Sequence, residues 1–147
     1  MAEKKGARLP IATLVVRETA RTVKKAIPGI RRLHLVGSRL RHSYARDLDF
    51  VAVSPQMAGR NTTIRIGTLT VNLFFSSPRD VEAAILEFGL GFDILRWKRK
   101  AKSLGYRLNR YGLWRGQVVV TRKMAQIASL LDLPLRPFLV YTLKHPL

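Results

Sequence analysis

The N-terminal part of the chain carries its core-forming residues at helical spacing. They recur three or four positions apart, at Ala12, Val16, Thr19/Ala20, Val23 and Ile27. This period places them on one face of a helix. Pro10 suits the first position of such a helix, and Pro28-Gly29 ends it. We therefore expect a helix between these two prolines.

The next part of the chain has the patterns of β-strands. Apolar runs at residues 33–37 and 48–54 predict two strands, and residues 62–66 and 69–75 flank Gly67-Thr68, which suits a two-residue hairpin turn. In the last of these strands, side chains alternate between two faces. The alternation places Asn72 on the face opposite to the one with the most apolar residues, which are Val71, Leu73 and Phe75.

The second half returns to mixed patterns. We expect helices over 79–87, 93–104 and 121–131, a strand over 106–109, a hairpin over 111–120 and a turn segment over 133–137. Helices that alternate with a mixed sheet define an α+β protein. We divide the chain into a basic N-terminal arm, a sheet-bearing subdomain and a smaller C-terminal, thumb-like subdomain, over residues 1–9, 10–77 and 78–147.

Composition limits the kind of protein. A chain of 147 residues that is 47% hydrophobic can build one domain with a core. No segment reads as a signal peptide or approaches the roughly 20 apolar residues of a membrane span, so we expect an intracellular protein, in cytoplasm or nucleoid, without a membrane partner. The absence of cysteine excludes disulfides, thiol catalysis and Cys-ligated zinc.

The net charge of the chain indicates the kind of partner that it binds. Twenty-seven basic against nine acidic residues give a net charge of +18, which favours a polyanionic partner. A ribosome-type RNA-binding protein or the charged surface of a thermophile protein are the alternatives. Residues 94–131 contain no acidic side chain. Within this stretch the candidate DNA contacts are Arg96, Lys98, Arg99 and Lys102.

One motif indicates chemistry. Gly37-Ser38 is followed, nine residues after the serine, by Asp47-Leu48-Asp49 at the start of a predicted strand. Asp47 and Asp49 then point the same way, and two adjacent carboxylates favour a shared Mg²⁺ that carries a triphosphate. The glycine allows a close approach to phosphate, and the serine adds a hydroxyl. Asn72 faces the two aspartates.

These motifs resemble those of a known family. Gly-Ser-Arg-Leu-Arg, Asp-Leu-Asp and Val-Asn-Leu-Phe, over residues 37–41, 47–49 and 71–74, resemble the palm of the family X DNA polymerases, in the polymerase β nucleotidyltransferase superfamily. Residues 105–114 and 130–137 are similar to the family's Asn-x-Tyr-Gly-Leu hairpin and its closing Pro-containing segment. The resemblance covers about residues 10–140 and implies a monomeric minimal polymerase without an N-terminal DNA-gripping domain.

The resemblance also implies roles for residues. Ser38 would bond the triphosphate and Arg41 its terminal phosphates. Leu40 stands where the family has another arginine, so that part of the clamp is either missing or supplied by Arg39. Gly89 would lie against the sugar, and Lys98 against the template strand. The implied cofactor is two Mg²⁺ ions, for which Mn²⁺ can substitute, and the implied substrates are a dNTP and primer-template or gapped DNA, in gap filling and repair.

Asn72 departs from the family pattern. The family has an aspartate there that ligates the catalytic metal and takes the proton of the primer 3′-hydroxyl. Asparagine keeps an oxygen ligand but loses the charge and the basicity. The residue is either an inactivating substitution or part of a naturally degenerate site. Three functions remain open: a minimal DNA polymerase, an antitoxin-type nucleotidyltransferase, and a non-catalytic nucleic-acid-binding protein.

Overall fold

A mixed sheet forms the centre of the protein. The computed structural model describes residues 7–86, 113–114, 117–118 and 136–147. Its four-stranded sheet has the order β2-β4-β6-β5, made of Arg32–Val36, Leu48–Val53, Leu69–Ser76 and Asn61–Ile66. The pair β4/β6 is parallel and the other two pairs are antiparallel. This confirms the α+β class, and each of these strands lies within one residue of its predicted bounds.

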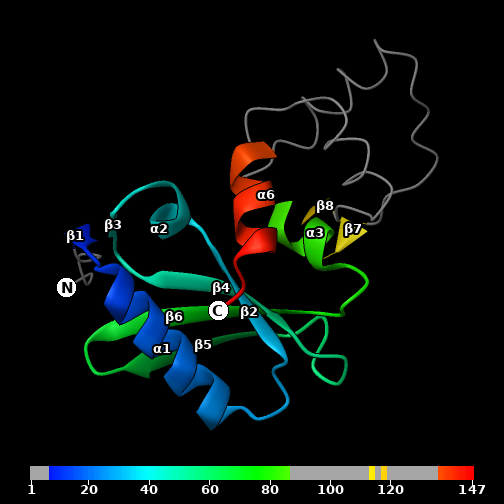
Figure 1. Ribbon diagram of the computed structural model, residues 1–147. Helices are drawn as coiled ribbons and strands as arrows, with labels where there is room; N and C mark the ends of the chain where they lie inside the picture. Colours follow the sequence, from blue (N-terminus) through cyan, green and yellow to red (C-terminus); the bar gives the residue numbers. More distant parts are fainter. Residues whose placement is uncertain (1–6, 87–112, 115–116, 119–135) are drawn as a thin grey trace.

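The long N-terminal helix covers one face of the sheet. Helix α1 (Thr13–Ala26) lies on one side, and α2 (Ser38–Arg41), α3 (Val81–Ala84) and α6 (Arg136–Lys144) lie on the other (Figure 1). Val16, Ala20 and Val23 of α1 are buried in one cluster with residues that include Phe50 and Leu73. The helical period predicted from the sequence thus forms this core, because it gives α1 a single apolar stripe.

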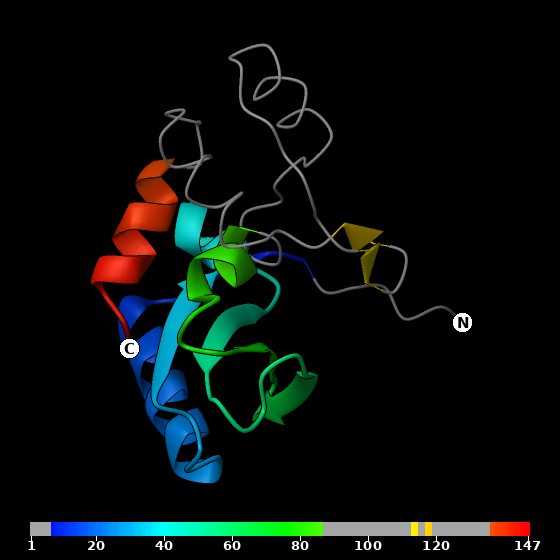
Figure 2. The ribbon, with the colours of Figure 1, turned by 90° about the vertical axis from the view of Figure 1, so that its right-hand side faces the viewer.

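The last helix packs against the edge strand β2. The hydroxyl of Thr142 in α6 donates to the carbonyl oxygen of Leu35 over 2.6 Å. Leu33 and Leu147 exchange backbone hydrogen bonds, with N–O distances of 2.7 and 3.4 Å. Figure 2 shows α6 beside β2 and above α1. Residues 136–147, which the sequence division grouped with the C-terminal subdomain, therefore pack on the sheet-bearing unit.

Three predicted element boundaries are wrong. Pro10 lies in the short strand β1 (Leu9–Pro10), which pairs with β3 (Tyr44–Ala45), and the first helix begins only at Thr13. The backbone N–H of buried Ile11 still donates to Ser43 O, so the chain stays extended past the proline.

The other two boundaries also have local causes. Helix α3 starts at Val81 rather than at residue 79, because a turn closed by the Asp80 N–H on Ser77 O precedes it. Arg136 and Pro137, expected in a turn segment, form the first turn of α6, where a proline is tolerated.

For the second half of the chain, one further predicted element can be compared with the structure. Strands β7 (Leu113–Trp114) and β8 (Gln117–Val118) pair antiparallel inside the hairpin expected over 111–120. The helices expected over 93–104 and 121–131 and the strand over 106–109 lie outside the described residues. Among the residues that the structure does describe, no helix is long and apolar enough to cross a membrane.

Candidate metal and nucleotide site

Sheet register brings the three polar residues of the motif together. Asp49 in β4 pairs with Asn72 in the parallel neighbour β6, so their side chains lie on the same face. Asp47 immediately precedes β4. This face is opposite to the one that α1 covers, since the neighbours Leu48 and Phe50 point into the α1 core. The convergence expected from the alternation of side chains is therefore what the structure shows.

The Asn72 amide connects the two carboxylates. Its Nδ2 donates to Asp49 Oδ1 over 2.7 Å and to Asp47 Oδ2 over 3.1 Å. Its Oδ1 accepts a hydrogen bond of 2.9 Å from the hydroxyl of Thr63. Both amide protons thus lie between two acidic groups, where a cation would otherwise relieve their repulsion. In this arrangement Asn72 acts as an internal, neutral substitute for a bridging ion.

The environment of Asp49 disfavours its charge. Burial raises the pKa of the Asp49 carboxyl, and the nearby Asp47 carboxylate raises it further, while the hydrogen bond from Asn72 lowers it. Burial is the largest of these three effects. A carboxyl that is costly to ionise in the free protein would be stabilised in its charged form by a cation bound beside it.

Gly37 is required by the approach of Asp49. Its φ of 73° is in the left-handed region that side chains other than glycine rarely adopt. A Cβ at this position would collide with Asp49 Oδ2 and lie 3.0 Å from Asp49 Cγ. The sequence motif predicts that the missing side chain at Gly37 makes room for phosphate. In the structure it makes room for the Asp49 carboxylate.

The residues that follow Gly37 in α2 differ in their contacts. Ser38 begins the short helix α2 and is half-buried, and Arg41 at its end is exposed. Arg39 turns toward the start of α1, where its Nε donates to Ile11 O over 2.7 Å and Nη2 approaches the Thr13 hydroxyl at 3.4 Å. Arg39 therefore anchors α2 to the N-terminal segment, so the expectation that it supplies the missing phosphate clamp is not what the geometry favours.

Thr63 is a member of the site that the sequence analysis missed. It lies opposite Asn72 in the antiparallel pair β5/β6 and is exposed. The signal was present, because a two-residue turn at Gly67-Thr68 pairs Ile66 with Leu69 and, counting outward, Thr63 with Asn72. Its hydroxyl can donate or accept, and so it can satisfy the Asn72 amide in either orientation.

The donor set fits one divalent ion better than two. Mg²⁺ in proteins is held by one or two carboxylates together with substrate phosphates, and Asp47 and Asp49 supply that pair. In the described part of the chain, no group of three or more His, Cys, Asp or Glu side chains is placed to hold a metal. The third ligand would be the Asn72 amide oxygen, which requires the amide to turn over from its present orientation.

The remaining predicted residues lie outside the described residues. These are Gly89, Arg96, Lys98, Arg99 and Lys102. No protein-family model matches the chain, and no curated protein matches it either. The functional assignment therefore rests on motif spacing and on the geometry around Asp49.

Proposed function

We propose that the protein is a minimal nucleotidyltransferase of the family X polymerase type, which adds deoxynucleotides to a primer 3′ end in gapped DNA. The observation that supports this most is the meeting of Asp47, Asp49 and Asn72 on one face of the sheet, beside Gly37-Ser38. The sheet face carries the acidic pair, and the net charge of +18 suits a DNA partner.

The residues have separable tasks in this proposal. Asp47 and Asp49 would hold a Mg²⁺ ion through their carboxylates, and the ion would supply positive charge that stabilises the triphosphate and the pyrophosphate leaving group. Ser38 would donate a hydrogen bond to phosphate, and exposed Arg41 would neutralise phosphate charge. Asn72 has no basic atom, so it cannot take the proton of a 3′-hydroxyl. The chain is then a slow enzyme whose binding functions are intact.

A second function has support from one contact. The Asn72 amide already bridges the two carboxylates at 2.7 and 3.1 Å, which lowers the need for a metal. A non-catalytic nucleic-acid-binding relative would tolerate such a self-neutralised site. No contact among the described residues specifically favours an antitoxin-type nucleotidyltransferase.

Single-turnover primer extension on gapped DNA separates these functions. Asn72→Asp restores a general base and a third carboxylate, and general bases contribute about 10²–10⁴-fold. We expect at least that gain in rate, with a much smaller change in the affinity for Mg·dNTP. The double variant Asn72→Asp/Asp49→Asn is the control and should lose the gain. Extension by neither the original chain nor Asn72→Asp would favour the non-catalytic function.

A further inference from the structure

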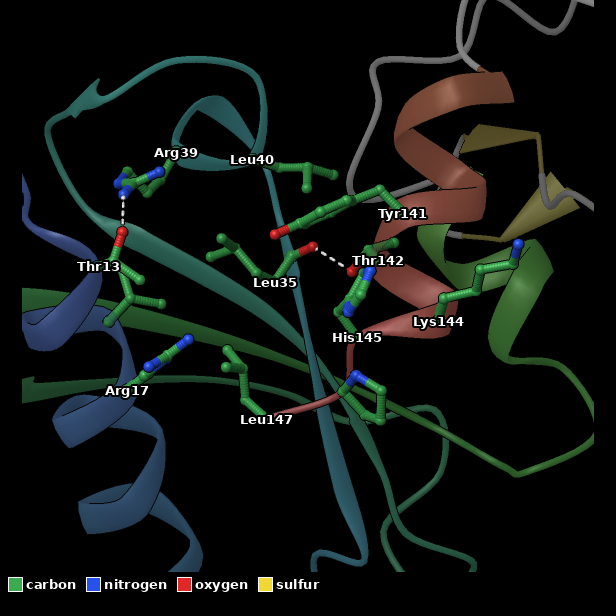
Figure 3. A pocket seen from close by; sticks show the side chains of 12 residues that line it. Thr13, Arg17, Leu35, Arg39, Leu40, Tyr141, Thr142, Lys144, His145 and Leu147 are labelled. Carbon is green, nitrogen blue, oxygen red and sulfur yellow. Dashed lines mark hydrogen bonds between the residues drawn. The ribbon is translucent and has the colours of Figure 1, made fainter.

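A hollow lies away from the acidic pair, across the edge strand β2. It has a volume of about 460 Å³, within the roughly 300–1,000 Å³ of ligand pockets. Helix α1 contributes one wall and α6 the other, with Leu35 of β2 between them (Figure 3). The lining contains none of Asp47, Asp49 and Asn72. The hollow is therefore separate from the site proposed for nucleotidyl transfer.

Among the described residues the lining is basic and contains no acidic side chain. It includes Arg17 of α1, Arg39 of α2 and Lys144 of α6, together with His145 directly after α6. Within the described part of the chain, Arg39 donates hydrogen bonds to neutral oxygens of Ile11, Thr13 and His42, and these do not neutralise its charge. Groups of like charge around one hollow repel one another unless an anion enters. The ligand must therefore carry negative charge.

The hollow also offers an aromatic surface. Tyr141 is 57% exposed, and its ring centroid lies 4.6 Å from that of His145. In Figure 3 the Tyr141 side chain extends from α6 over Leu35 toward α1. An exposed aromatic ring beside basic side chains is the arrangement on which unpaired bases stack. A nucleotide has both a flat base, which can stack on the tyrosine ring, and a phosphate, which the basic side chains can bind.

We propose that this hollow binds an unpaired nucleotide of a nucleic-acid strand, with the base on Tyr141 and the phosphate at Arg17. The site goes beyond the proposed function, because it uses neither the acidic pair nor a metal. A strand is favoured over a free nucleotide by α1 itself. Arg21 and Lys24 follow Arg17 at i+4 and i+7, and both are exposed. Lys24 Nζ donates to Leu147 O over 3.1 Å at the rim of the hollow, so positive charge continues along the helix from Arg17.

Photo-crosslinking tests the site directly. An oligothymidylate that contains one 5-iodouracil is bound to the full chain, irradiated and mapped by mass spectrometry. We expect a crosslink at Tyr141. Tyr141→Leu should abolish it and weaken strand binding at this site by about 5- to 160-fold, which corresponds to the roughly 1–3 kcal/mol of one base stacked on an aromatic ring. Arg17→Gln should also weaken strand binding, because it removes the charge that faces the phosphate. Arg65→Gln, on the far strand β5, makes the same charge change and should have no effect.

The possible outcomes are distinct. Crosslinks that never map to 136–147 would overturn the proposal, as would loss of the crosslink in Arg65→Gln as large as in Arg17→Gln. Displacement of the strand by thymidine monophosphate at equal concentration would show a free-nucleotide site instead. Asp49→Asn should leave the crosslink unchanged, so this result does not depend on whether the chain proves to be a polymerase. Circular dichroism of each variant verifies its fold.

Discussion

At the scale of single residues, the side chain of Asn72 decides the state of the candidate site. Its amide nitrogen lies within hydrogen-bond distance of both carboxylates, and its oxygen faces Thr63. A cation that bridges the two carboxylates would need the position that Asn72 Nδ2 now occupies. The amide would therefore have to rotate and present its oxygen to the ion. The Asn72 amide therefore relieves the repulsion between the two carboxylates in the free protein and would compete with a bound cation.

Replacing the amide by a third carboxylate should make folding dependent on Mg²⁺. Asn72→Asp is expected to lower the thermal midpoint without divalent ions, since three carboxylates then repel at one point. With Mg²⁺ at about 100 times its dissociation constant, binding should add roughly 2.7 kcal/mol of stability. Thermal unfolding with and without Mg²⁺ measures both effects.

Asn61→Asp is the matched control for this change. It adds the same charge to β5, at an exposed position away from the acidic pair. Its midpoint should not respond to Mg²⁺ more than that of the original chain. An equal response in both variants would mean that the ion binds the protein without using this site.

Gly37 gives a second residue-scale prediction. Gly37→Ala should cost more stability than Gly59→Ala, although both residues have positive φ, at 73° and 86°. An added Cβ at Gly59 meets nothing within 4 Å, so only the backbone cost of about 1–2 kcal/mol applies there. At Gly37 the Cβ also displaces the Asp49 carboxylate. Urea unfolding of both variants measures the difference, and equal losses would contradict the close approach.

At the scale of elements, the contact between α6 and β2 holds a buried histidine. His34 is 1% exposed, and its Nδ1 lies 2.8 Å from the carbonyl oxygen of Thr142. Since a carbonyl only accepts, Nδ1 carries the proton of the neutral ring. Nε2 is buried without a hydrogen-bond partner among the described residues. The pKa of His34 is lowered by burial and by the charge of Arg32, against the opposing effect of the Thr142 hydrogen bond.

This lowered pKa predicts a loss of stability in mild acid. The folded protein holds His34 neutral, whereas the unfolded chain takes up a proton below about pH 6.5. The free energy of unfolding should therefore fall as pH decreases below that value, by at most about 1.4 kcal/mol per pH unit. Urea unfolding between pH 7 and pH 5 measures it, with His34→Asn as the variant that removes the group.

His42→Asn is the control for the acid effect, because His42 is exposed. The slope should disappear in His34→Asn relative to the original chain and persist in His42→Asn. If the slope is unchanged in His34→Asn, the acid sensitivity comes from other groups and the contact between α6 and β2 is not its source.

The elements also show what the sequence could predict. The strands and the α1 core follow from local periodicity, and the meeting of Asp49 with Asn72 follows from side-chain alternation once the strands are neighbours. The parallel pairing of β4 with β6 was not encoded locally. The same holds for α6, whose first two residues were expected in a turn segment. It packs on β2 through Thr142, which donates to Leu35 O, and the residues after it reach β2 through the backbone of Leu147. Such long-range contacts leave no periodic signal.

Residue roles were harder to predict than elements. Gly37 and Arg39 belong to a motif whose family resemblance directs attention to phosphate. In the structure the glycine makes room for Asp49, and the arginine binds the backbone at Ile11. A linear motif gives spacing along the chain but not direction in space, so these two assignments depended on coordinates.

At the scale of the whole molecule, the charge of +18 predicts the nature of DNA binding. Binding should weaken steeply with salt and depend little on sequence, because phosphate contacts release counterions and carry no base information. Triple reversal of Lys98, Arg99 and Lys102 to Glu should reduce both affinity and salt slope. Fluorescence anisotropy at several salt concentrations measures them, and unchanged affinity at low salt would place the DNA elsewhere.

We propose that Asp47 and Asp49 form a divalent cation site beside Gly37-Ser38. Mn²⁺ suits the same oxygen ligands as Mg²⁺ and broadens the NMR signals of amides near it. At substoichiometric Mn²⁺ we expect the amide signals of Gly37, Ser38 and Asp49 to disappear first. Asp49→Asn should keep them sharp, and excess Mg²⁺ should restore them. Broadening that leaves these amides untouched, or that persists fully in Asp49→Asn, would show that the ion does not bind between Asp47 and Asp49.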